Sequence, residues 1–211
     1  MEKEEQLRIV LITFILTLLS VMVLLTIDVR LLSVHGVKTA FSISTFLTIW
    51  WGFYFHFGWK VPILNKILYK ENISGTWFGT YESVNVKNDQ IYTGDIALVI
   101  KQNFLNIHIT SYTERFKNNS YSEILTLDKK SEKNKLVYVY AQEEVNALDQ
   151  SIRKGTTELE LTINKNKAEF YGKFWTNHST IGQLRLKNIS KEYIEFFDDV
   201  KLKASPGGTV L

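Results

Sequence analysis

In the second third of the chain, residues 73–81 read Ile-Ser-Gly-Thr-Trp-Phe-Gly-Thr-Tyr. This stretch opens a run at residues 75–83 in which side-chain character changes with a period of two, as is typical of a β-strand. A glycine inside such a run indicates a sharp bend or a close approach to a neighbouring backbone. We therefore predict that a strand starts here and that Gly79 serves either a sharp bend or a close backbone approach.

Seven more runs with the same period follow, at residues 92–101, 104–112, 121–127, 136–141, 157–163, 168–176 and 182–188. Short connectors rich in Asn, Ser and Lys separate most of them, and no helical pattern intervenes, so we expect hairpins and an antiparallel sheet. Eight short strands in sequence order most simply close into an up-and-down, lipocalin-like β-barrel. A two-sheet sandwich is the alternative.

The end of the chain carries a helical pattern. Ser190 is a candidate N-cap, and Tyr193, Phe196, Phe197 and Val200 fall on one face. We expect this helix to close the end of the barrel, and residues 204–211 to form a disordered tail.

Two transmembrane α-helices are predicted near the N-terminus. Residues 9–27 and 39–59 contain no Asp, Glu, Lys or Arg, and each stretch is long enough to cross about 30 Å of hydrocarbon. A cleavable signal peptide is the rival interpretation of the first stretch, but Glu2, Glu4 and Glu5 precede it in place of a basic cluster.

The domain organisation follows from these patterns. Residues 1–60 form a two-helix transmembrane hairpin, 61–72 an interfacial linker in which Pro62 can open a short helix, 73–203 the barrel domain, and 204–211 the tail. Basic residues are more numerous on the side of the termini than in the loop between the spans. The positive-inside rule then places the N-terminus and the barrel in the cytoplasm.

Small and polar residues form a stripe on the second predicted span. Thr45, Thr48, Gly52 and His56 follow a helical spacing and lie on one face. In lipid, such residues mark the places where helices touch. The stripe predicts packing either within the hairpin or between protomers of a homo-oligomer.

Composition excludes several classes of function. The chain has 25 Lys and Arg against 22 Asp and Glu, and the excess lies in the first 70 residues. A neutral C-terminal domain argues against DNA or RNA polymers as partners. With no Cys, four scattered His and no nucleotide-loop or hydrolase motif, we expect neither an enzyme nor a metal or cofactor site. A spatial catalytic constellation stays open.

The G-x-W sequence at Gly75–Thr76–Trp77 that opens the predicted barrel resembles the lipocalin and fatty-acid-binding superfamily. In that superfamily the Trp plugs the closed end and a late Arg packs across it. The resemblance implies that Trp77 is a structural plug and that Arg185 covers it.

The whole layout resembles a narrower family. Two N-terminal spans, a short basic linker, an I-S-G-T-W strand and a compact barrel are similar to the two-transmembrane, β-strand-rich effectors of bacterial anti-phage CBASS operons. This resemblance implies that the barrel senses a cyclic dinucleotide, that binding drives oligomerisation, and that the spans then disrupt the inner membrane and kill the infected cell.

A cyclic dinucleotide presents two bases for stacking and two phosphates for cations. From residue chemistry within the inferred barrel, the predicted ligand-binding residues are Tyr81, Arg115, Tyr138, Tyr140, Trp175 and Arg185. Two other functions stay open: a membrane-tethered carrier of a lipid or other hydrophobic ligand, and a structural module with a filled barrel.

Overall fold

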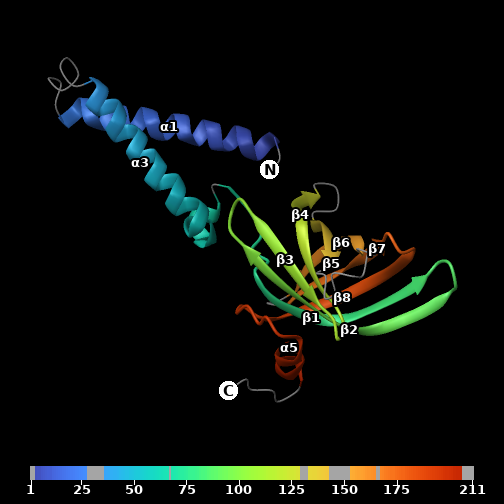
Figure 1. The fold of residues 1–211 in the computed structure, drawn as a ribbon. Helices are drawn as coiled ribbons and strands as arrows, with labels where there is room; N and C mark the ends of the chain where they lie inside the picture. The colour runs from blue at the N-terminus through green and yellow to red at the C-terminus, as the bar shows by residue number, and fades with distance from the viewer. Residues whose placement is uncertain are drawn as a thin grey trace. The chain divides into compact units, whose positions relative to one another are not determined.

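The computed structural model describes residues 3–27, 36–66, 68–128, 133–142, 153–164 and 167–205. The chain forms two compact units. The helical unit comprises Met1–Asn72 together with Asn103–Leu105, and the barrel unit comprises Ile73–Gln102 and Asn106–Leu211. Figure 1 shows the helices and strands of both units.

The barrel unit is a closed, eight-stranded antiparallel barrel in which each strand pairs with its neighbours in sequence and β8 pairs with β1. This confirms the predicted barrel and rules out the two-sheet sandwich. The strands are β1 (Gly75–Asn85), β2 (Gln90–Gln102), β3 (Ile107–Tyr112), β4 (Lys117–Asp128), β5 (Lys133–Gln142), β6 (Lys154–Asn164), β7 (Lys167–Thr176) and β8 (Thr180–Ser190).

Alternate side chains of the strands fill the barrel interior. The buried core consists of Ile73, Trp77, Ile96, Leu98, Ile100, Ile109, Leu136, Tyr138, Leu159, Leu161, Phe170, Leu184 and Leu186. Because strand side chains alternate between faces, these residues fix which positions of each strand point inward. On β1, for example, Trp77 and Tyr81 point inward, whereas the exposed Thr80 and Glu82 point outward.

Two glycines allow neighbouring strands to approach closely. A Cβ atom on Gly79 of β1 would overlap the backbone carbonyl of Arg185 on β8, and one on Gly172 of β7 would overlap the carbonyl of Glu158 on β6. Any side chain would force these strand pairs apart. The predicted close backbone approach at Gly79 is confirmed.

The helical unit contains α1 (Lys3–Ile27), α3 (Gly36–His56), a 3-10 turn η1 (Gly58–Lys60) and the short α4 (Pro62–Asn65). The indole N–H of Trp51 on α3 donates to the Thr13 hydroxyl of α1 at 3.1 Å. Phe104, from the turn between β2 and β3, is buried in this unit among Tyr54, Trp59 and Leu68.

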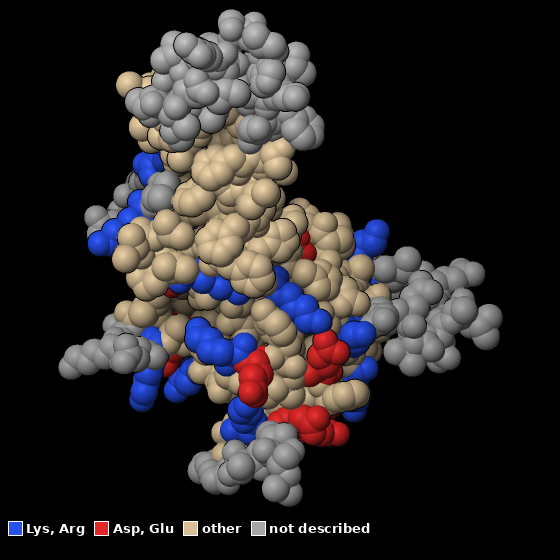
Figure 2. Space-filling view, turned by 90° about the vertical axis from the view of Figure 1, so that its left-hand side faces the viewer, with Lys and Arg blue, Asp and Glu red and all other residues tan. Residues whose placement is uncertain are grey.

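Helix α1 has the length and hydropathy of a membrane span over Gln6–Val23, and its side chains are largely exposed. Among the described residues no second segment meets the same criterion. Helix α3 is helical where the second span was predicted. The second span stays a prediction. Charged side chains are sparse on the visible face of the described helices and mixed in sign over the barrel unit (Figure 2).

The C-terminal helix differs from the expectation. Helix α5 (Phe197–Ala204) follows Phe196 rather than a Ser190 cap, because Ser190 is the last residue of β8. Val200 of α5 is buried, the Phe197 ring lies 6.5 Å from that of Phe78 on β1, and Lys201 pairs with Asp95 of β2 at 3.2 Å. The helix therefore covers an outer face of the barrel and does not close its end. Residues 206–211 lie outside the described residues.

Candidate functional site

The barrel has two chemically different ends. We call the closed end the one where β1 begins and β2 ends, and the mouth the opposite end, where β1 turns into β2, β3 into β4, and β7 into β8. The connection between β5 and β6 also belongs to the mouth. Of that connection, residues 143–152 lie outside the described residues.

Trp77 lies inside the barrel at the closed end. Its side chain is 1% exposed, its indole N–H donates to the Ile73 carbonyl at 2.9 Å, and its ring centroid is 4.3 Å from that of Phe170. The position is the one expected of a plug. Arg185 does not cover Trp77, because Leu184 and Leu186 point inward and the intervening Arg185 is exposed on the outer wall.

A layer of aromatic rings crosses the barrel between the closed end and the mouth. The Tyr138 and Tyr140 ring centroids are 5.9 Å apart, and those of Tyr81 and Phe174 are 6.5 Å apart. Glycines make room for three of these rings: Gly94 beside Tyr81, Gly155 beside Tyr140, and Gly182 beside Phe174. At this level, side chains occupy the barrel interior.

Burial changes the acidity of the two central phenols. Removal from water raises the pKa of Tyr138 well above its ordinary value, although a hydrogen bond with Thr157 acts in the opposite direction. Burial likewise raises the pKa of Tyr140 to about 12. Both phenols are therefore neutral at physiological pH and can act as hydrogen-bond donors.

Polar side chains lie in the barrel wall beside this layer. Ser83, Ser111, Ser120 and Thr157 are buried. The Asn118 amide donates to the Ser111 hydroxyl at 3.1 Å, and the Ser120 hydroxyl donates to the Glu123 carboxylate. The hydroxyl and amide groups of this wall can read the edges of a base, and the wall also carries one carboxylate, that of Glu123.

Two arginines lie at the mouth. The Arg153 guanidinium is 4.9 Å from the ring centroid of Phe116, and its carbonyl accepts the Gln142 N–H at 2.8 Å. Arg115 is exposed in the turn between β3 and β4, which the Thr113 hydroxyl closes by accepting the Phe116 N–H at 3.1 Å. Neither guanidinium has a carboxylate partner within the part of the chain that the structure describes.

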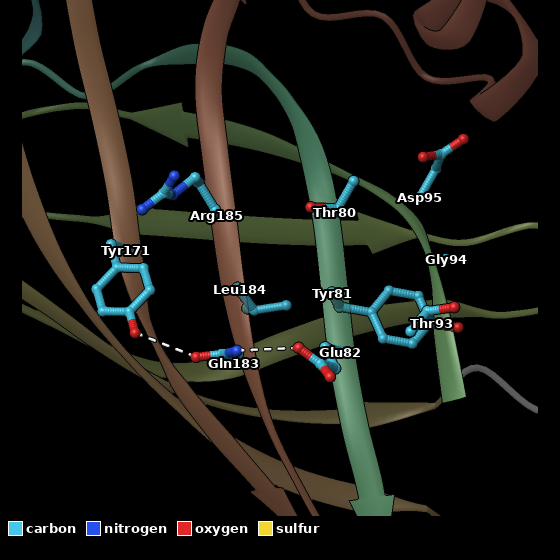
Figure 3. Close-up of a pocket in the computed structure, with 10 residues that line it drawn as sticks. All are labelled: Thr80, Tyr81, Glu82, Thr93, Gly94, Asp95, Tyr171, Gln183, Leu184 and Arg185. Atoms are coloured by element: carbon cyan, nitrogen blue, oxygen red, sulfur yellow. Dashed lines mark hydrogen bonds between the residues drawn. The ribbon is translucent and has the colours of Figure 1, made fainter. Parts of the chain in front are cut away.

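A concave region lies on the outer wall of β7, β8, β1 and β2 (Figure 3). Its volume is about 640 Å³. Across its floor the Tyr171 hydroxyl donates to Gln183 at 3.1 Å, and the Gln183 amide donates to Glu82 at 3.1 Å. The Arg185 guanidinium lies 5.7 Å from the Tyr171 ring centroid. We call this region the outer hollow.

The structure brings together only some of the predicted ligand-binding residues. Tyr81, Tyr138 and Tyr140 meet inside the barrel, and Arg115 lies at its mouth. Trp175 and Arg185 were predicted to line the ligand site together with these residues, but they point outward, because the inward positions beside them are taken by Phe174 and Leu184.

Residue chemistry alone missed the polar wall and the pairing of Arg153 with Phe116. The sequence did indicate that Thr157 points inward, since Thr157 shares its strand face with the core residues Leu159 and Leu161. For Arg153 the sequence held no such signal, because the connection between β5 and β6 has no period. Among the described residues, no three His, Asp or Glu side chains come close enough together to hold a metal ion.

The stripe on α3 does not pack against α1. Thr45, Thr48, Gly52 and His56 are all exposed, and a Cβ atom on Gly52 would meet open space. The His56 imidazole instead bonds with the Gly52 carbonyl at 2.9 Å. Contact within the hairpin uses Trp51 and Tyr54 on another side of α3, with Ile9, Ile12 and Thr13 of α1. Of the two predicted uses of the stripe, only contact between protomers stays a prediction.

Sequence comparisons identify the class to which this barrel belongs. The family model of the Cap15 cyclic dinucleotide receptor domain matches residues 70–188. This range includes all eight strands except the last two residues of β8. The chain is also 31% identical over 156 residues to the CD-NTase-associated protein 15 of Staphylococcus schleiferi, covering 70% of this chain and 76% of that protein. The chain therefore belongs to the Cap15 family of CBASS effectors.

Proposed function

We propose that this protein is a membrane-anchored effector of anti-phage defence that a cyclic dinucleotide switches on. The supporting observation is the family match over the barrel together with the chemistry of the mouth. Aromatic rings, hydroxyl and amide side chains and two arginines without carboxylate partners among the described residues lie in this part of the barrel. These are the groups that a small dianion with two bases needs.

The mouth supports this assignment better than the rest of the described barrel. The bases would stack toward Tyr140 and Phe116, and the phosphates would meet Arg153 and Arg115. Arginine suits this role because its planar fork can donate two parallel hydrogen bonds to one phosphate. The outer hollow is less suitable for a dianion, since the carboxylates of Glu82 and Asp95 line it beside Arg185.

The helical unit supplies the proposed output. Helix α1 fits a membrane anchor, and we assign α3 as the second span, which places both termini in the cytoplasm at the bacterial inner membrane. A polar stripe that faces away from α1 needs a partner within lipid. Thr45, Thr48, Gly52 and His56 therefore belong, in this proposal, to contacts between protomers. Ligand binding drives this homo-oligomer, which disrupts the bilayer and kills the infected cell.

A carrier of lipids or other hydrophobic ligands is the alternative function. Such a carrier needs an apolar space inside the barrel. In the described part of the barrel, the core side chains and the aromatic layer occupy the interior, and polar side chains lie in the wall beside that layer. Both features favour the cyclic dinucleotide receptor.

The test uses full-length protein in detergent. Its melting temperature is measured against cyclic di-AMP, cyclic di-GMP and cyclic GMP-AMP, with the linear dinucleotides as controls. A ligand at 100 times its dissociation constant adds about 2.7 kcal/mol, a rise of several degrees. The active nucleotide should also enlarge the particle in light scattering and release dye from proteoliposomes. No shift with any cyclic dinucleotide in a wider panel of base and linkage isomers would overturn the proposal.

A further inference from the structure

The outer wall of the barrel carries a row of apolar side chains near the mouth. Trp175 of β7 is opposite Ile181 of β8, Ile181 is opposite Val84 of β1, and Val84 is opposite Ile91 of β2. The exposed fractions of Trp175, Ile181 and Ile91 are 45%, 49% and 66%. One apolar residue on each of four adjacent strands forms a continuous patch, which on a soluble surface indicates an interaction site.

Nearer the closed end than this row, the two halves of the same wall carry side chains of opposite charge. The β7–β8 half carries the cations Lys173 and Arg185, and the β1–β2 half carries the carboxylates Glu82 and Asp95 (Figure 3 shows all but Lys173). Of the two carboxylates, Asp95 already pairs with Lys201 of α5, so Glu82 is the one that a second copy would meet. Neither cation has a carboxylate partner within the described ranges. The boundary between the halves is the seam where β8 pairs with β1.

This arrangement complements itself under a two-fold axis. If two copies face each other with the axis along the seam, β8 of one copy lies over β1 of the other, and β7 lies over β2. Ile181 then meets the Val84 position and Trp175 meets the Ile91 position. The carboxylate of Glu82 comes to lie near the cations Lys173 and Arg185 of the second copy.

We propose that this outer wall, from β7 to β2, is the contact surface between two copies of the chain. A two-fold contact uses the same patch on both copies and so requires a self-complementary surface. The outer hollow gives the side chains of the second copy room on an otherwise convex wall. An anionic membrane surface fits less well, because Glu82 and Asp95 would face it. The inference specifies the homo-oligomer of the proposed function and rests on that part of it.

Because the chain contains no Cys, single cysteines can map this contact on full-length protein in proteoliposomes. Facing sheets pack about 10 Å apart, so a short bismaleimide should join copies of the Ile181→Cys variant, whose position is next to the axis. Ile91→Cys alone lies too far from the axis to react with its own copy. Ile91→Cys should react when it is combined with Trp175→Cys. The matched control is Ile124→Cys, at an exposed Ile of β4. The bismaleimide should not crosslink copies of this variant.

Charge reversal provides a second test in the Ile181→Cys background. Glu82→Lys should weaken the contact about tenfold or more, because like charges then face each other. Adding Lys173→Glu should restore it. Ile181→Cys crosslinking no better than Ile124→Cys, with and without the nucleotides named above, overturns the surface. If light scattering still shows nucleotide-driven oligomers, the proposed function stands without this surface. If no oligomer forms, both the proposed oligomerisation and this contact surface are wrong.

Discussion

The Tyr140 side chain lies directly over Gly155 of the neighbouring strand, with its phenol oxygen where a Cβ atom would be. This contact belongs to a pattern in which an aromatic ring covers a glycine across a strand pair. It explains how a narrow barrel can hold several tyrosines at one level. It also makes Gly155 as important as the ring it accommodates.

We therefore expect Gly155→Val to lower the free energy of unfolding by about 1–3 kcal/mol through overpacking. In a Tyr140→Leu background the same change should cost less, and a double-mutant cycle in urea unfolding would measure this coupling. Thr156→Val, at the adjacent outward position, is the control and should change stability little. An equal cost of Gly155→Val in both backgrounds would contradict the contact.

Nucleotide affinity should depend on Arg153. Arg153→Lys keeps the charge but removes the planar fork, so we expect affinity for the active cyclic dinucleotide to fall about tenfold. Arg185→Lys makes the same chemical change on the outer wall and should leave affinity unchanged in calorimetric titration. The opposite result would move the nucleotide site from the mouth to the outer hollow.

Trp77 should dominate the stability of the closed end. Trp77→Ala removes a buried ring and its hydrogen bond to Ile73, so the free energy of unfolding should fall by about 3–5 kcal/mol. Trp175→Ala, on the outer wall, should cost much less. Comparing the urea midpoints of the two variants tests this, and similar midpoints would argue against Trp77 as the plug.

The buried phenols predict a loss of stability in alkali. The pKa of Tyr140 is about 12 in the folded chain, against about 10 when unfolded, so the folded state holds its proton longer. The stabilising contribution is complete below about pH 10 and is lost as pH rises toward 12. Over that range stability should fall by up to about 1.4 kcal/mol per pH unit for this group.

Tyr140→Phe should remove this part of the slope when urea midpoints are compared between pH 9 and 12. Tyr121→Phe is the control, because Tyr121 is 60% exposed and should leave the slope unchanged. If stability falls with pH equally steeply in Tyr140→Phe and in the parent chain, the Tyr140 phenol is not buried in solution.

Periodicity was sufficient to predict the barrel, since eight alternating runs joined by turn residues admit few other closed arrangements. It did not place Trp175, because a strand with bulky side chains on both faces does not reveal which face is inward. For Arg185 the signal was present, since Leu184 and Leu186 alternate with polar residues on β8 and mark the inward face. The inward choice at β7 depends on Phe170 and Phe174 meeting Trp77 and Tyr81 across the barrel, a contact that no local pattern contains.

The helix after β8 was misplaced for a similar reason. The apolar face of this helix predicts that the face is buried, but it does not predict which surface of the barrel the helix packs against. On the outer wall of β2, Ala97 and Val99 are buried along with the inward Ile96 and Leu98, which identifies a strand covered on both sides. That run of consecutive apolar residues was the available signal for where the C-terminal segment packs.

The order of the strands has a consequence for synthesis. Seven of the eight strand pairings join sequence neighbours and can form as hairpins while the chain emerges, but the pairing of β1 with β8 waits for the last strand. A ribosome thus releases the helices early and completes the receptor only at the end. A partly translated chain therefore holds the helices without a closed barrel, so under the proposed function it cannot respond to its ligand before synthesis is complete.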